Sequence, residues 1–246
     1  MQFQDKVALV TGGSSGLGLA IAKELVEQGA HVVITGRRQQ QLDEALSSLG
    51  SRASAVVADV SSSTDLSGLF SEIKSRHGRI DVLVANAGMG ELAPLGSITE
   101  EHFDRVFNTN VKGVTFTVQG ALPLMGDGSS IVIIGSTASI DPGPGLSVYG
   151  ATKAALRTLV RSWVLDIKGR GVRINLLSPG PVDTDSLRNM LAEHAEAVIK
   201  SLSEKSTIGR IGQAHEIAKA VAFLASDAAS YINGVELFAD GGASQV

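Results

Sequence analysis

Tyr149 and Lys153 stand four positions apart in the stretch Tyr-Gly-Ala-Thr-Lys, which opens a long helical pattern after a loop rich in glycine and proline. Residues at this spacing lie on one helix face, a turn apart. A phenol has an unperturbed pKa of about 10, and we expect the Lys153 ammonium to lower the pKa of Tyr149 by stabilising the tyrosinate. Such a phenol can exchange a proton with a carbonyl or alcohol oxygen. The same spacing is also typical of ordinary solvated helix faces.

A glycine-rich turn near the start of the chain could hold a second reactant. Residues 11–18 read Thr-Gly-Gly-Ser-Ser-Gly-Leu-Gly, between an apolar run and a helical pattern. Glycines at such a turn let the backbone approach a pyrophosphate, and the helix N-terminus offers free N–H groups. The spacing is a variant of the dinucleotide fingerprint. It predicts cofactor contacts from Gly12, Ser14, Ser15, Gly16, Leu17 and Gly18.

Residues 12–16 also satisfy Gly-x-Ser-x-Gly, the nucleophile elbow of serine hydrolases. That elbow belongs in the middle of a sheet, with an acid and a histidine following it. Here one predicted strand precedes the turn, and none of the five histidines stands out as a partner. We therefore favour the dinucleotide site over the hydrolase.

Strand-like and helical segments alternate along the whole chain. Apolar runs predict strands at 6–11, 31–35, 53–58, 81–85, 130–135, 172–177 and 234–238. Helical patterns occupy 16–29, 39–49, 63–77, 99–106, 108–125, 147–169 and 215–226. This order predicts one α/β domain over residues 1–246, a Rossmann-type doubly wound parallel sheet of about seven strands with helices on both faces. Residues 185–205 are interpreted as a small helical substrate lid, with an ordinary surface helix pair as the alternative.

The end of the second predicted strand bears on cofactor choice. It reads Thr-Gly-Arg-Arg, and no acidic residue occurs between Glu27 and Asp43. A carboxylate there would bind the ribose hydroxyls of NAD, whereas guanidinium groups suit the 2′-phosphate of NADP. Arg37 and Arg38 therefore favour NADP(H), with use of NAD(H) as a further possibility.

Composition excludes several classes of protein. The formal charge is −4 with interspersed charges, so we expect no nucleic-acid surface and no polybasic membrane patch. The chain has no cysteine, which excludes disulfides and thiolate sites, and its histidines have no metal spacing. No apolar run approaches the roughly 18 residues of a membrane span. We expect a soluble cytoplasmic protein without a metal.

The chain resembles the short-chain dehydrogenases/reductases from end to end. The matching pieces are the turn at 11–18, Asp59-Val60, Asn86-Ala87-Gly88, Asn110, Ser136, Tyr149-x3-Lys153, Pro179-Gly180 and Asp240-Gly241-Gly242. The resemblance implies that Tyr149 donates a proton to a carbonyl as hydride leaves the nicotinamide, and that Lys153 binds the nicotinamide ribose. It implies that Ser136 positions the substrate oxygen and that Asn110 holds a water in a proton relay. It also implies a homotetramer.

The same resemblance implies the remaining cofactor contacts. Asp59 and Val60 would contact the adenine, and Asn86, Ala87 and Gly88 would line the ribose and diphosphate channel. Pro179, Gly180, Val182 and Thr184 would lie at the carboxamide. One position departs from the pattern: Ser15 stands where many NADP-preferring relatives carry a second basic residue.

The apolar or small residues Met89, Gly90, Leu146, Leu187 and Met190 are candidate walls of the substrate pocket. They favour an apolar or aromatic carbonyl compound over a sugar or a charged acid. The segment Gly209-Arg210-Ile211-Gly212-Gln213 is similar to that of 3-oxoacyl-acyl-carrier-protein reductases, which makes this activity the alternative. The loop at 126–130 lacks the basic residues that dock an acidic carrier protein. A non-catalytic NADP-sensing protein is a further alternative, which the complete Asn/Ser/Tyr/Lys set disfavours.

Overall fold

A parallel sheet organises the chain, of which the computed structural model describes residues 1–245. Within this range seven strands pair in the order β3-β2-β1-β4-β5-β6-β9. They are β1 (Val7–Thr11), β2 (His31–Gly36), β3 (Ala53–Val57), β4 (Val82–Ala85), β5 (Ser130–Ile134), β6 (Arg173–Pro179) and β9 (Glu236–Ala239). A second, two-stranded parallel pair joins β7 (Val182–Asp183) to β8 (Gly212–Gln213). The predicted single-domain, Rossmann-type architecture is confirmed.

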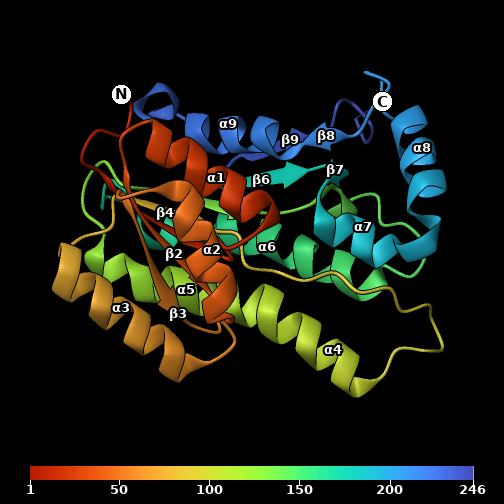
Figure 1. The fold of residues 1–246 in the computed structure, drawn as a ribbon, viewed down its shortest axis with the longest axis horizontal. Coiled ribbons are helices and arrows are strands. Elements are labelled where there is room, and N and C mark those ends of the chain that lie inside the picture. Colours follow the sequence, from red (N-terminus) through yellow and green to blue (C-terminus); the bar gives the residue numbers. More distant parts are fainter. Residues whose placement is uncertain (246) are drawn as a thin grey trace.

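Helices cover both faces of the sheet (Figure 1). They are α1 (Gly16–Glu27), α2 (Gln39–Leu49), α3 (Ser63–His77), α4 (Glu100–Phe107), α5 (Val114–Ala121), α6 (Ser147–Asp166), α7 (Asp185–Leu191), α8 (Ala195–Lys205) and α9 (Ala214–Ala225). Short 3-10 turns occupy Leu122–Leu124, Thr137–Ser139, Ala192–His194 and Asp227–Ala229. Helix α1 packs beside α9 and α2 on one face, and α3, α5 and α6 cover the other. Among residues 1–245, no helix combines the length and apolar character that crossing a bilayer requires.

The central strands are buried on both faces, which explains their continuous apolar sequences. Successive side chains of a strand point to opposite faces. In β1, Ala8 and Val10 pack with the core beneath α1, α2 and α9, whereas Leu9 packs with the core beneath α3, α5 and α6. One short apolar strand therefore contributes side chains to the hydrophobic cores on both faces of the sheet.

The predicted helix at 108–125 is interrupted in the structure. Residues Asn108–Gly113 form a π-helical turn between α4 and α5, and the helical stretch closes in a 3-10 turn at Leu122–Leu124. π-Helical turns commonly occur at functional sites. The segment at 185–205 forms helices as predicted, namely α7 and α8, which lie together at the right of Figure 1.

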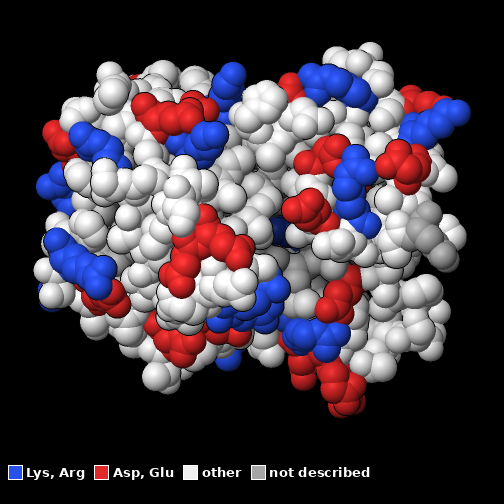
Figure 2. Space-filling view, in the orientation of Figure 1, with Lys and Arg blue, Asp and Glu red and all other residues white. Residues whose placement is uncertain are grey.

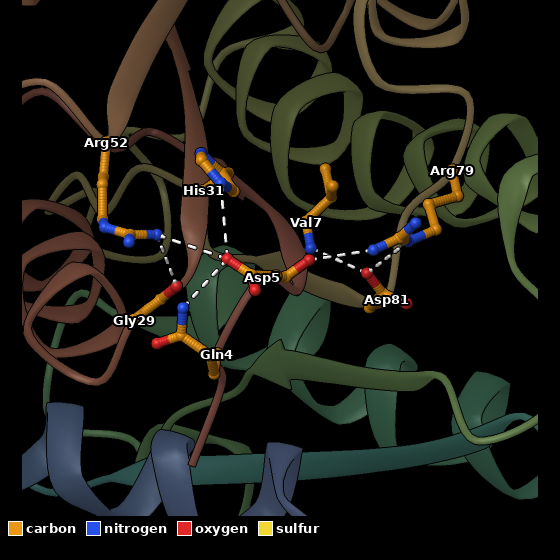
Figure 3. A network of polar contacts seen from close by, with 8 residues as sticks. All are labelled: Gln4, Asp5, Val7, Gly29, His31, Arg52, Arg79 and Asp81. Atoms are coloured by element: carbon orange, nitrogen blue, oxygen red, sulfur yellow. Dashed lines mark hydrogen bonds and ion pairs between the residues drawn. The ribbon is translucent and has the colours of Figure 1, made fainter. Parts of the chain in front are cut away.

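A polar network closes the amino-terminal edge of the sheet (Figure 3). The Asp81 carboxylate accepts hydrogen bonds from the Val7 backbone N–H at 2.7 Å and from Arg79 Nε at 3.0 Å. Arg79 also donates to the carbonyl oxygen of Asp5 at 2.8 Å. The Asp5 carboxylate in turn lies 3.7 Å from Arg52. Because Asp81 precedes β4 and Val7 begins β1, this carboxylate aligns the starts of two neighbouring strands.

Replacing Asp81 with alanine is expected to lower the free energy of unfolding by about 1–3 kcal/mol, because a buried N–H loses its acceptor. Urea denaturation measures the change. Glu27→Ala is the control, since Glu27 pairs with Lys23 at 4.0 Å on an exposed helix face. Such surface pairs contribute about 0–1 kcal/mol. Equal losses for the two variants would contradict the role assigned to Asp81.

Candidate active site and dinucleotide cleft

A cleft of about 1040 Å³ runs along the carboxyl ends of the strands. Figure 2 shows this face hollowed near its centre, with positive and negative side chains interspersed around the hollow. The predicted cofactor and substrate residues all line it: Gly12, Ser14, Ser15, Gly16, Leu17, Gly18, Arg37, Arg38, Asp59, Val60, Asn86, Ala87, Gly88, Met89, Gly90, Ser136, Leu146, Tyr149, Lys153, Pro179, Gly180, Val182, Thr184, Leu187 and Met190. The fold therefore brings together segments that are far apart in the sequence.

The glycine turn has the close packing that a dinucleotide site needs. A Cβ atom on Gly18 would lie 2.0 Å from the carbonyl oxygen of Gly12, so only glycine lets α1 approach the turn. Gly12 has a φ of 64°, a backbone conformation that glycine adopts without strain. Asn86 Nδ2 donates to the carbonyl oxygens of Thr11 and Gly12 at 2.9 and 3.2 Å and fixes the turn from the neighbouring strand.

The first turn of α1 leaves its backbone donors available. Its N-cap residue, Ser15, makes no side-chain capping hydrogen bond. Free N–H groups at a helix N-terminus favour an anion, and the bare glycine backbone beside them leaves room for one. The residues of this part of the cleft therefore fit a pyrophosphate group.

Helix α6 places Tyr149 and Lys153 on the wall of the cleft. Lys153 Nζ lies 5.7 Å from the centroid of the Tyr149 ring and donates to the carbonyl oxygen of Ile134 at 2.8 Å. Burial lowers the pKa of Lys153 to about 8. The Tyr149 hydroxyl is hydrogen-bonded to Ser136, whose own hydroxyl also accepts from the backbone N–H of Ala138 at 3.2 Å.

The expected lowering of the Tyr149 pKa by Lys153 is wrong. Burial raises the pKa of the Tyr149 phenol, because the tyrosinate loses its hydration, and the hydrogen bond to Ser136 opposes this only in part. The Lys153 ammonium donates to the Ile134 carbonyl rather than to the phenol, and its own burial lowers its pKa to about 8. Sequence spacing places the two groups together, but it does not report how far each is desolvated.

Asn110 lies behind the cleft wall rather than in it. It is fully buried in the π-helical turn. Its Oδ1 accepts from the Met89 N–H at 2.9 Å, and its Nδ2 donates to the Met89 carbonyl at 2.8 Å and to Thr152 Oγ1 at 3.1 Å. A Cβ on Gly88 would lie 3.3 Å from Asn110 Oδ1 and 3.6 Å from Lys153 Nζ. Asn110 and Lys153 therefore lie close to the same bare backbone position.

The two arginines lie at the other end of the cleft. Both are exposed, and Arg37 Nη1 is 4.0 Å from the Asp59 carboxylate. A Cβ on Gly36 would lie 3.3 Å from Ser14 Oγ, so the strand end and the glycine turn are in contact here. This end of the cleft combines two guanidinium groups, a hydroxyl and bare backbone, and it suits a phosphate monoester.

Residues 185–205 line the cleft with more side chains than the two predicted substrate walls Leu187 and Met190. Thr184 Oγ1 accepts from the Leu187 N–H at 3.2 Å and caps α7, which carries Leu187 and Met190. Further lining residues include Gln41, Leu92, Thr109, Asp141, Leu191, Val198, Ser201, Leu202, Lys205, Ala243 and Ser244. Leu191 and Val198 belong, with Leu187 and Met190, to the amphipathic pattern on which the interpretation of residues 185–205 as a lid is based, and Leu202 extends that pattern. No local signal marks Ala243 or Ser244, which reach the cleft through the packing of the C-terminal segment.

Comparisons with known proteins agree with this geometry. The sequence pattern of a family described as enoyl-(acyl carrier protein) reductase matches residues 12–244. The chain is similar to oxidoreductase asL5 of Sarocladium schorii, with 44% identity over 98% of this chain and 96% of the relative. A short-chain dehydrogenase/reductase structure from Brucella melitensis, described as glucose/ribitol dehydrogenase, has a TM-score of 0.93 at 31% identity, covering 98% of each chain. A Burkholderia cenocepacia short-chain dehydrogenase in complex with NADP has a TM-score of 0.91 at 34% identity, covering 99% of each chain.

Proposed function

Since this chain belongs to the short-chain dehydrogenase/reductase family, we propose that it is an NADP(H)-dependent oxidoreductase that interconverts a ketone or aldehyde and an alcohol. We place it among carbonyl reductases of apolar or aromatic small molecules. The observation that carries the proposal is the meeting of Ser136, Tyr149 and Lys153 in the same cleft as the glycine turn. A bound nicotinamide supplies the hydride.

Tyr149 and the side chains around it transfer the proton, orient the carbonyl and bind the cofactor. Tyr149 gives its phenolic proton to the carbonyl oxygen, and its raised pKa keeps that proton in place until the oxygen gains charge. Ser136 holds the same oxygen by a hydrogen bond and so orients the carbonyl. Lys153 binds the nicotinamide ribose, and Asn110 supports a water between Lys153 and solvent. The closeness of both Lys153 Nζ and Asn110 Oδ1 to Gly88 supports that pairing.

The rest of the cleft divides between cofactor and substrate. Arg37 and Arg38 bind the 2′-phosphate, which gives the preference for NADP(H) over NAD(H). Helices α7 and α8, residues 185–205, act as a lid that excludes water during transfer. The apolar side chains of Met89, Leu146, Leu187 and Met190 form the substrate walls, although Lys205 and Asp141 also reach the cleft.

A screen of the purified protein tests this function. NADPH and NADH are supplied separately with acetophenone, other aryl ketones, aliphatic aldehydes and sugars, and oxidation of the reduced cofactor is followed by absorbance. We expect turnover with NADPH and aryl ketones. Cofactor binding without turnover of any carbonyl would instead favour a non-catalytic NADP-sensing protein.

Reduction of a 3-oxoacyl group on acyl carrier protein is a second candidate. The matching family is described by a carrier-protein activity, and Arg170 and Arg173 provide two positive charges. However, Arg173 donates to the carbonyl oxygens of Leu224 and Ser226 at 2.8 and 2.9 Å, so it is engaged within the fold. Faster turnover of an acyl-carrier-protein thioester than of free aryl ketones would decide for this candidate.

We further propose a homotetramer built partly on the helices that follow β4 and β5. Large apolar side chains are exposed there: Phe103 is 44% exposed, Phe116 43% and Leu165 73%. Contact with a second copy would remove this surface from water. Light scattering in solution measures the mass directly.

The lowered pKa of Lys153 predicts a pH dependence. Below about pH 8 the free protein carries the ammonium, and above it the amine is neutral. We expect kcat/KM for NADPH to fall by up to about tenfold per pH unit above that point, because this parameter reports ionisations of the free enzyme. The raised pKa of Tyr149 keeps its titration at still higher pH, so the two groups are distinguishable. A profile that stays flat to pH 10 would contradict the assignment.

A further inference from the structure

The loop after β4 forms the wall of the cleft that faces Tyr149. Met89, Gly90 and Leu92 all line the cleft. A Cβ on Gly90 would lie 3.5 Å from the Tyr149 ring, so the loop backbone is packed against the phenol. The Ala93 N–H donates to the Gly145 carbonyl at 2.9 Å, which joins the loop to the segment before α6. The position of this loop therefore sets the space available beside the Tyr149 ring.

Glu91, within the same loop, is held by α4. Its carboxylate accepts from Arg105 Nη2 at 2.5 Å and Arg105 Nε at 3.2 Å, and His102 Nδ1 lies 3.2 Å away. The two nitrogens of Arg105 engage separate carboxylate oxygens, which is the geometry of a bidentate pair. The Arg105 guanidinium also lowers the pKa of Glu91, so the carboxylate is ionised at neutral pH.

His102 makes this attachment more than a surface ion pair. The residue is 8% exposed, and its Nε2 is buried without a hydrogen-bond partner among the described residues. With a hydrogen on Nδ1, the ring donates to the Glu91 carboxylate, and this contact is the ring's polar attachment among the described residues. Replacing the Glu91 carboxylate with an amide would leave one uncharged acceptor oxygen for the donors of His102 and Arg105, and it would place an NH2 group against the remaining donor.

The two attachments of the loop come from one continuous helical unit. Arg105 lies on α4, and Asn110 lies on the π-helical turn that follows it directly. Asn110 holds the backbone of Met89 on both sides, and Arg105 and His102 hold the side chain of Glu91. Gly90 lies between these two fixed points, against Tyr149.

We propose that Glu91 is a positioning residue that sets which carbonyl compounds the cleft accepts. Its contacts with Arg105 and His102 hold Gly90 against the Tyr149 ring and Leu92 in the wall of the cleft. When the loop is held in place, the space beside the Tyr149 ring suits small aryl ketones. When the loop is free to move, bulkier ketones can enter, and small ketones bind more weakly. This inference rests on the proposed carbonyl reductase activity and adds the element that determines its substrate size.

Glu91→Gln tests the proposal, because it keeps the side-chain shape and removes the charge. With NADPH, we expect KM for acetophenone to rise about fivefold to tenfold, in keeping with the loss of a charge-assisted pair, while kcat changes by less than about threefold. The preference for acetophenone over the larger 2-acetonaphthone should shrink. The Kd of NADPH should stay unchanged, since Glu91 lies outside the cofactor half of the cleft.

Glu72→Gln is the matched control. Glu72 pairs with Arg76 at 2.7 Å on α3, and its side chain is 35% exposed, as is that of Glu91. The control should leave both ketones unaffected. Arg105→Gln should reproduce the effect of Glu91→Gln, and the double variant should add little to either, because both remove the same contact. An unchanged KM and ketone preference in folded Glu91→Gln would overturn the proposal.

Hydrogen exchange of the cofactor-free protein gives a readout that is independent of turnover. Amides at 89–93 should exchange faster in Glu91→Gln and remain as in the unaltered protein in Glu72→Gln. Uniformly faster exchange throughout Glu91→Gln would show a general loss of stability and would also overturn the proposal. If the unaltered protein reduces neither ketone, the proposed function fails, and the exchange rates still decide whether Glu91 holds the loop.

Discussion

Tyr149→Phe is expected to lower kcat for ketone reduction by about 10²- to 10⁴-fold, the usual contribution of a positioned general acid. The substitution removes one hydroxyl and keeps the ring. Gly90 packs closely against this ring, since a Cβ on Gly90 would lie 3.5 Å from it, and the phenylalanine ring keeps that contact. Stopped-flow single-turnover measurements with NADPH and acetophenone would report the chemical step directly.

The affinity of the Tyr149→Phe variant for NADPH is the control for this prediction. NADPH binding, followed by fluorescence, should change by less than about threefold, because the phenol oxygen is assigned to the carbonyl and Lys153 to the ribose. Ser136→Ala should reduce kcat less than Tyr149→Phe does, since Ser136 orients the oxygen without donating the transferred proton. If Tyr149→Phe retained a tenth of the original kcat, another group would have to supply that proton.

Replacing Arg37 and Arg38 together with serine is expected to raise the Kd of NADPH by at least about 100-fold, because hydrogen bonds to charged groups contribute about 1.5–3 kcal/mol each. The Kd of NADH should change by less than about threefold. Both arginines line the cleft beside Gly36, and the side chain of Arg37 is 72% exposed, so its loss leaves no buried cavity. Isothermal titration with each cofactor measures the two constants.

Asp59 makes the contributions of Arg37 and Arg38 to NADPH binding unequal. Its carboxylate lies 4.0 Å from Arg37, so part of the Arg37 charge is already balanced in the cofactor-free protein. The single substitution Arg38→Ser is therefore expected to weaken NADPH binding more than Arg37→Ser. Arg76→Ser, which removes an arginine from α3, should affect neither cofactor. A parallel loss of NADH and NADPH affinity in the double variant would contradict recognition of the 2′-phosphate.

Local chemistry explains why much of the fold could be predicted from the sequence. The central strands of the parallel sheet are buried on both faces, so each appears as a short apolar run such as Val7–Thr11. Gly18 must be glycine because its helix packs directly on the Gly12 carbonyl. The four-residue spacing of Tyr149 and Lys153 sets one helix face. These constraints act within a few residues, and for that reason they are visible along the chain.

The sequence by itself determined the alternating α/β order, the dinucleotide turn and the residue types that meet at the cleft. Only the tertiary structure decided the π-helical turn at Asn110, the attachment of Glu91 to Arg105 and the entry of Ser244 into the cleft. It also decided the direction of the Tyr149 pKa shift. The physical reason is that desolvation and long-range contacts depend on what packs around a side chain, and periodicity reports only which face that side chain occupies.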